Sequence, residues 1–131
     1  MDNHFKSTFN MRKILLFFIA SVCLFSYADP DEIVLNNPNH QHDHSGQPLF
    51  PADQPDVYYD DVTQQIIIDG TGEASYYDVE ITSLSTFYVV LSTQVNGNYD
   101  TIDVSSLPDD NYEIVITSSL NNEFLGYFTK E

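Results

Sequence analysis

Apolar and polar side chains alternate along most of the chain that follows Val57. Alternation with a period of two places every second side chain on one face of an extended strand, which is typical of a sheet with one buried face. Turn-forming residues, mostly Asp, Asn and Gly, separate the alternating runs. The pattern predicts strands at residues 57–59, 65–68, 75–82, 87–95, 99–104, 112–116 and 124–129. Short strands separated by turns in this way favour an all-β sandwich or barrel of about seven strands.

The most informative local pattern is Leu107-Pro108, followed by a polar turn and then by Tyr112 at the start of an alternating strand. Many immunoglobulin-like domains enter their penultimate strand in this way. The tyrosine ring packs in the core, and its hydroxyl bonds a backbone group a few residues upstream. We therefore expect Leu107, Pro108 and Tyr112 to form such a corner of an immunoglobulin-like β-sandwich. The alternative is a tyrosine that only begins a strand.

An apolar run covers residues 14–25, directly after Arg12 and Lys13. It is followed by Ser26-Tyr27-Ala28, which has small residues at the positions that a signal peptidase reads. These features are typical of a secretory signal peptide, so we expect cleavage between Ala28 and Asp29. The alternative is a retained membrane anchor, but the run is shorter than the roughly 20 residues that span a bilayer.

The expected leader covers residues 1–28. Translation could start at Met1 or at Met11, since both precede Arg12 and Lys13. Such a leader would direct export of the protein to the periplasm, the cell surface or the medium. Its cleavage would also remove Cys23, which is the only cysteine of the chain. The exported domain would then depend on its hydrophobic core rather than on a disulfide.

Residues 29–55 are rich in Pro, Asn, His and acidic side chains. A segment of this composition cannot bury enough apolar surface to fold alone. We expect a flexible linker here, with one candidate strand at residues 32–35, followed by a single folded domain at residues 56–131. We also expect a chain that begins at Leu49 to be as stable as the longer one.

The chain is strongly acidic, with 20 Asp and Glu, 4 Lys and Arg and a net charge of -16. Once the leader is removed, Lys130 is the only Lys or Arg that remains. A negative surface repels phosphate backbones and anionic lipid head groups, so we expect neither nucleic acid nor a membrane surface as a partner. The charge could attract cations or basic proteins, or it could serve only to keep the domain soluble.

His40, His42 and His44 form a tract in which an extended backbone would point all imidazoles the same way, about 6.5–7 Å apart. Such a tract could hold Zn²⁺, Cu²⁺ or Ni²⁺. The alternative is a polar linker that binds metal only adventitiously. The acidic turns at residues 60–61, 69–73 and 109–111 could likewise bind Ca²⁺, or be ordinary β-turns built from Asp, Asn and Gly.

Every histidine that follows the leader lies in residues 29–55. The folded domain therefore offers no imidazole as a general base for Ser or Thr. A Gly-rich loop of the kind that cradles phosphates is also missing. We expect no enzyme activity, no catalytic residues and no cofactor.

The stretches 77–82, 89–91, 102–104 and 107–116, with the closing Gly126-Tyr127-Phe128-Thr129, together carry a family resemblance. In these residues the chain resembles a secreted bacterial domain-of-unknown-function family, numbered three-two-four-four. The resemblance implies a signal peptide, a brief linker and one immunoglobulin-like sandwich, and it implies no catalytic residues. The layout is also similar to the C-terminal sorting domain of the type IX secretion system, although this chain lacks the basic cluster of that signal.

These observations leave two functions open. The first is a secreted binding or adhesion module that recognises a protein or a glycan through tyrosine-bearing strands or loops. The second is a structural or assembly domain that pairs through an exposed edge strand, including pairing with a second copy, or that follows a secretion route.

The expected strand at residues 87–95 carries no charge, although sheet edges are normally protected by charge, proline or bulges. We expect it to lie at an edge and to be the interface, with Tyr88 and Val90 facing outward. The alternation points the other apolar side chains inward, namely Phe87, Val89, Leu91 and Val95. The alternative is a central strand that is already paired on both sides.

Overall fold

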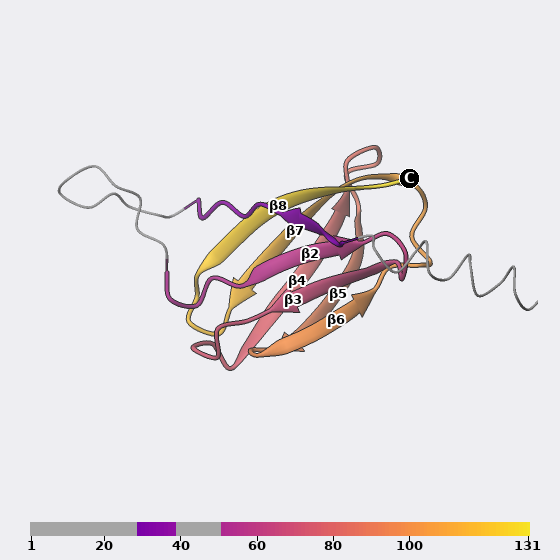
Figure 1. The fold of residues 1–131 in the computed structure, drawn as a ribbon. Coiled ribbons are helices and arrows are strands. Elements are labelled where there is room, and N and C mark those ends of the chain that lie inside the picture. Colours follow the sequence, from indigo (N-terminus) through magenta and orange to yellow (C-terminus); the bar gives the residue numbers. More distant parts are fainter. Residues whose placement is uncertain (1–28, 39–50) are drawn as a thin grey trace, which may run out of the picture.

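The chain folds into two antiparallel sheets in a computed structural model that describes residues 29–38 and 51–131. The strands are β1 (Asp31–Ile33), β2 (Asp56–Asp60), β3 (Gln65–Asp69), β4 (Tyr76–Ser83), β5 (Val89–Asn96), β6 (Tyr99–Asp103), β7 (Asp110–Ser118) and β8 (Glu123–Lys130). Sheet A has the order β1-β2-β3-β6, and sheet B has the order β5-β4-β7-β8 (Figure 1). The predicted all-β architecture is confirmed, with one strand more than expected. No helix in the described part is long and apolar enough to cross a membrane.

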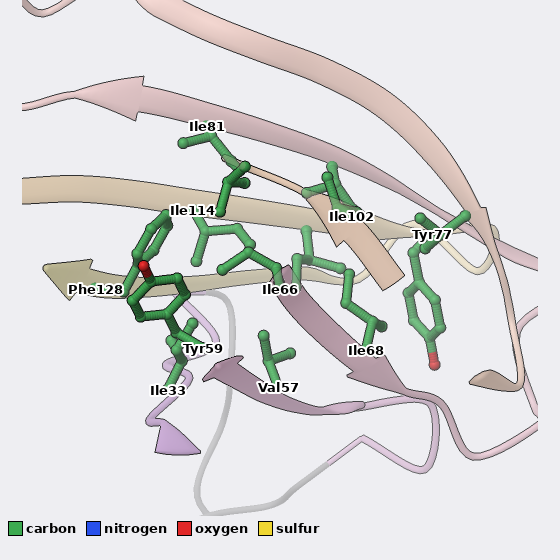
Figure 2. Close-up of a cluster of buried hydrophobic side chains, with 14 of the residues drawn as sticks. Ile33, Val57, Tyr59, Ile66, Ile68, Tyr77, Ile81, Ile102, Ile114 and Phe128 are labelled. Carbon is green, nitrogen blue, oxygen red and sulfur yellow. The ribbon is translucent and has the colours of Figure 1, made fainter. Parts of the chain in front are cut away.

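The core lies between the two sheets and follows the period-two pattern of the sequence. On β4, Tyr77, Val79 and Ile81 are buried, whereas Asp78 and Glu80 between them are exposed. Sheet A contributes a facing set of apolar side chains, which includes Val57, Tyr59, Ile66, Ile68 and Ile102. Figure 2 shows labelled side chains of both sheets, such as Ile66 of sheet A and Ile81 of sheet B, in the space between the sheets. The alternation thus predicted the buried face of most strands.

The segment before residue 56, which we expected to be a flexible linker, forms part of the sandwich where the structure describes it. β1 pairs with β2, with Ile33 opposite Val57, and Ile33 is buried in the core. A little further on, Asn36 forms a bridge with Leu125 of β8, with N–H···O distances of 2.8 and 2.7 Å. The segment therefore touches sheet A first and sheet B next, and it covers the side of the sandwich where β2 and β8 lie (Figure 1). We call this side the closed edge.

A close approach at Gly126 makes this closure possible. A Cβ atom at this position would lie 2.7 Å from Cγ2 of Ile33 and 3.0 Å from Cδ2 of Leu35. Because side chains do not tolerate such distances, glycine lets the N-terminal segment pack directly against β8.

Residues 51–55 are also tied to the sandwich, through Asp53. Its carboxylate accepts hydrogen bonds from Ser118 Oγ and from Asn122 Nδ2, the latter at 2.9 and 3.1 Å. Its backbone carbonyl accepts a hydrogen bond of 2.7 Å from the hydroxyl of Tyr77. The domain boundary expected at residue 56 is therefore wrong in the described part. Composition shows that the segment cannot fold alone, but a segment that packs on existing strands does not need to.

Tyr112 is fully buried at the start of β7, and its hydroxyl donates a hydrogen bond to the carbonyl oxygen of Pro108. The ring stacks on Phe128, with centroids 5.2 Å apart, and Phe128 in turn lies 5.3 Å from the ring of Tyr59. Burial raises the pKa of Tyr112 above its ordinary value, so the hydroxyl remains a donor well above neutral pH. Leu107 is buried beside this turn. These positions are those that a tyrosine corner requires.

Lys130 is buried, although lysine is a residue type that is almost never found inside proteins without partners. Its ammonium group donates hydrogen bonds to the backbone carbonyls of Val104, Ser105 and Leu107, at 3.1 and 3.2 Å for the first two. The side chain thus holds the β6–β7 connection against the end of β8.

The Asn96-Gly97 turn does not form the hairpin with positive φ that this dipeptide often indicates. Neither residue has a positive φ, and the turn joins β5 of sheet B to β6 of sheet A. Gly97 is needed for another reason, since a Cβ atom there would lie 1.7 Å from the carbonyl oxygen of Ala74. The turn therefore carries the chain between the sheets at a point where two backbone segments touch.

Candidate functional site

β5 and β6 lie at the edges of their sheets, on the side opposite the closed edge. Within the described residues, β5 pairs along one side with β4 and β6 pairs along one side with β3. Their outer sides therefore present backbone N–H and C=O groups that pair with no other described strand. We call this side the open edge.

A β-bulge interrupts β5 near its start. Leu91 pairs with Ile81, but the next residue of β4, Thr82, pairs with Val89, so Val90 is the extra residue. The bulge shifts the alternation by one position. It is also one of the devices that protect edges, and sequence reasoning did not foresee it.

The shift corrects the expected orientation of two side chains. Leu91 is partly buried and Val95 is buried, as expected. Phe87 and Val89 were expected inward but are exposed, because Phe87 lies in the β4–β5 loop and Val89 lies on the far side of the bulge. A run of successive apolar residues cannot obey a period of two, and this run was the signal in the sequence that could have revealed the irregularity.

Successive apolar side chains are consequently exposed at the start of β5. The exposed fractions are 78% for Phe87, 75% for Tyr88, 50% for Val89 and 37% for Val90. We call these residues the apolar tip. Figure 1 shows the β4–β5 loop that carries Phe87 and Tyr88 projecting from one end of the sandwich. Single apolar residues are common on protein surfaces, whereas several exposed apolar residues that follow one another in the chain are a candidate interaction site.

The loop that carries the apolar tip is held by its own hydrogen bonds. Ser83 N–H donates to the carbonyl of Tyr88 at 3.0 Å, and Phe87 N–H donates to the carbonyl of Ser83 at 2.8 Å. Phe87 has a φ of 63°, a left-handed conformation that is uncommon for a bulky side chain. Strain of this kind persists where the surroundings determine the conformation, and it is concentrated at functional sites.

A carboxylate network anchors the same loop to β7. Asp110 accepts hydrogen bonds from Ser83 Oγ at 2.6 Å and from Ser85 Oγ at 2.5 Å. These hydrogen bonds, first the one from Ser83, hold the pKa of Asp110 below its ordinary value. The apolar tip is thus presented by an organised loop rather than by a loose one.

A groove of about 290 Å³ lies between β5 and β6. From β5 it is lined by Leu91, Thr93, Gln94 and Val95, and from β6 by Asp100, Thr101, Ile102 and Asp103. The groove therefore runs along the open edge, with uncharged residues on one side and acidic residues on the other.

The other predicted sites fall in different places. His40, His42 and His44 lie outside the described residues, as does Ala28, whereas Asp29 is exposed at the start of the described part. In the acidic turn at residues 60–61, the carboxylate of Asp60 accepts backbone hydrogen bonds from Val62 and Thr63, at 3.0 and 3.3 Å. In residues 29–38 and 51–131, no group of three or more His, Cys, Asp or Glu is placed to hold a metal ion.

No family model matches the chain, and no curated protein matches it. Among solved structures, the chain is similar to the crystal structure of a DUF3244 family protein from Bacteroides vulgatus, described as having an immunoglobulin-like β-sandwich fold. The TM-score is 0.60 at 20% sequence identity, and the match covers 79% of this chain and 100% of that one. The predicted fold class is therefore confirmed: the chain has an immunoglobulin-like β-sandwich, similar to that of a protein from the family whose number the sequence resemblance indicated.

Proposed function

We propose that this protein is an exported, non-catalytic binding module that takes up an extended segment of a partner protein at its open edge. The observation that carries the proposal is the combination of an uncharged edge strand with an exposed apolar tip at its start. Addition of a strand to a sheet edge gives affinity through main-chain hydrogen bonds, and side-chain pockets give specificity. The leader expected at residues 1–28 supports export.

The composition of β5 supports the proposal that the open edge binds a partner. Proteins commonly protect an edge strand with charge, proline or a bulge. β5 carries no charge and no proline along its length, and its bulge at Val90 leaves the residues from Leu91 to the end of the strand in regular register. Phe87 and Tyr88 supply the kind of aromatic side chains that dominate binding energies at protein interfaces.

A protein ligand fits the arrangement better than a glycan. Sugar recognition by stacking uses aromatic rings that lie together. The exposed tyrosines outside the apolar tip lie on separate strands, with Tyr76 on β4, Tyr99 on β6 of the other sheet and Tyr127 on β8. The register places Tyr76 opposite Asn96 and Tyr127 opposite Glu113, at different levels of sheet B.

The absence of histidine and cysteine from residues 29–38 and 51–131 supports a non-catalytic role. Without an imidazole or a thiol, the described part cannot form a Ser–His or a Cys–His pair.

A displayed library of random peptides, selected on the full-length protein, tests the proposal. We expect the selected peptides to bind the parent at least about tenfold more tightly than the Val90→Lys variant. Val62→Lys is the matched control, because Val62 is also an exposed valine but lies in the β2–β3 turn. Peptides that bind Val90→Lys as tightly as the parent, or a library that yields no binder, would overturn the proposal.

Backbone methylation of a selected peptide tests strand addition itself. In a β-ladder, N–H groups point alternately toward and away from the neighbouring strand. Methylation of one alternate set of peptide nitrogens should abolish binding, whereas methylation of the other set should preserve it. Equal effects of both sets would show that binding does not occur by strand addition.

A further inference from the structure

The charges beside the open edge all have one sign. β5 itself carries no charged residue. On the neighbouring strand, Asp78 and Glu80 are exposed on the outer face of sheet B, and across the groove β6 carries Asp100 and Asp103. A strand added to β5 would therefore have Asp78 and Glu80 one strand further in, on the outer face of sheet B, and Asp100 and Asp103 across the groove.

Asp78 and Glu80 have no cation of the described chain beside them. The charge of Lys130 acts on Asp103 instead, whose pKa is lowered first by hydrogen bonds from Ser105 and also by this charge. Lys130 is the only Lys or Arg in residues 29–38 and 51–131, and it is buried against backbone carbonyls of the β6–β7 connection. Asp78 accepts a hydrogen bond of 3.0 Å from the amide of Gln94, which is neutral. The described domain thus leaves Asp78 and Glu80, on the strand next to β5, without an internal positive charge.

Distance decides whether this charge would affect a bound strand. Adjacent strands are about 4.8 Å apart, so a strand on β5 would lie about 10 Å from β4. This is close to the screening length of about 8 Å at physiological salt, so several carboxylates together would still attract a cation there. Complementary charge of this kind contributes mainly to specificity and to the association rate.

From these observations we infer that the partner is a different protein whose extended segment alternates basic and apolar side chains. Its basic residues face outward beside Ser92 and Gln94, toward Asp78 and Glu80. Its apolar residues face inward over the groove, where Leu91, Val95 and Ile102 lie. A second copy of this chain is not favoured, because the β5 strand that it would contribute carries no cation.

This inference rests on the proposed strand addition and specifies the partner's chemistry. It is tested with labelled peptides that alternate valine with lysine, glutamine or glutamate, whose binding to the full-length protein is measured by fluorescence anisotropy. The lysine peptide should bind about tenfold more tightly than the glutamine peptide at low salt, and the glutamate peptide should bind most weakly. The preference for lysine should shrink as salt is raised to physiological levels and beyond.

Two variants with the same change in net charge locate the effect. Asp78→Asn with Glu80→Gln should reduce the preference for lysine to about threefold or less, because these residues lie beside the proposed strand. Glu113→Gln with Glu123→Gln should preserve it, because these residues lie on β7 and β8, on the same face but away from β5.

The outcomes distinguish failure of the basic-partner inference from failure of the proposed strand addition. If the lysine and glutamine peptides bind equally, the basic partner is wrong but strand addition stands. If the lysine peptide binds equally well to Val90→Lys, binding is diffuse and both proposals are wrong. If none of these peptides binds while library peptides do, the partner chemistry alone is wrong. If the protein forms dimers in sedimentation experiments that Val90→Lys abolishes, the partner is a second copy and the inference is wrong.

Discussion

The closed edge of this sandwich is covered by the N-terminal segment, whereas the open edge is not covered by the described chain. At the closed edge, the N-terminal segment pairs with β2 and then bridges to β8, and Ile33 fills the space between the sheets. At the open edge, β5 and β6 end their sheets with no further described strand beside them. A strand at either edge would present unpaired backbone N–H and C=O groups, and the described chain pairs or covers these groups at the closed edge alone.

The difference suggests that the closed edge contributes to the stability of the fold and the open edge to binding. The closed edge contains the aromatic stack of Tyr59, Tyr112 and Phe128, and it buries side chains from β1, β2 and β8. The open edge exposes the apolar tip and has a partly buried Leu91 at its groove. Changes at the closed edge should therefore affect unfolding, whereas changes at the open edge should affect binding.

The largest effect is expected at the corner of the closed edge. Tyr112→Ala should lower the free energy of unfolding by about 3–5 kcal/mol, because it removes a buried ring from the aromatic stack. Tyr112→Phe should lower it by only about 1 kcal/mol, since it removes one hydrogen bond to Pro108 and keeps the ring. Urea denaturation measures both values. Equal stability of both variants and the parent would show that Tyr112 does not hold the corner.

Ile33→Ala comes next and tests the closing segment. It should lower the free energy of unfolding by about 2–4 kcal/mol, because Ile33 is buried between β2 and β8. The matched control is Val34→Ala, which changes a neighbour that is 72% exposed and should have an effect below about 0.5 kcal/mol.

A chain that begins at Leu49 lacks Ile33 and β1, so we expect it to be clearly less stable than the longer one. A truncated chain that melts at the same temperature would restore the linker interpretation.

Period-two alternation was enough to predict the fold class, most strands and the buried face of β4 and β7. It could not predict that the acidic, Pro-rich segment closes the sandwich, because docking depends on edges that exist only after the sheets have formed. It also could not place the bulge at Val90, since the extra residue is defined by the register with β4. The edge strand of the candidate site was therefore predictable, whereas the orientation of Phe87 and Val89 on it was not.

At the open edge, a change that weakens binding should leave the fold intact or strengthen it. Phe87→Gly should raise the free energy of unfolding by up to about 1 kcal/mol, because glycine adopts a φ of 63° without strain and the phenyl ring is exposed. The same variant should bind the selected peptides more weakly. Tyr88→Gly is the control, since Tyr88 has no positive φ and glycine there should destabilise by about 0.5–1 kcal/mol. Loss of stability in Phe87→Gly that matches the control would show that no strain is stored at Phe87.

The smallest expected effect is the loss of stabilisation by the Asp110 carboxylate at acid pH. The pKa of Asp110 is lower in the folded protein than in the unfolded chain, so the stabilisation by its carboxylate is complete above the ordinary value of 3.8 and is lost as the pH falls below it. NMR titration should give Asp110 a pKa below 3.8. Hydrogen exchange in the β4–β5 loop should accelerate in acid, and Asp110→Asn should make exchange there fast at neutral pH. An unshifted pKa would show that Ser83 and Ser85 do not hold this carboxylate in solution.

The bridge between Asn36 and Leu125 also bears on the order in which the protein is made. Ribosomes synthesise the N-terminal segment long before β8, so the contacts that close the sandwich must wait for its last strand. Contacts between such distant parts of a chain slow folding, because a long loop must be closed before they form. We expect β1 to gain protection from hydrogen exchange only together with β8 during refolding. The sandwich of such a chain is completed only after its last strand has been made, so Asn36 remains without its partner on β8 until then.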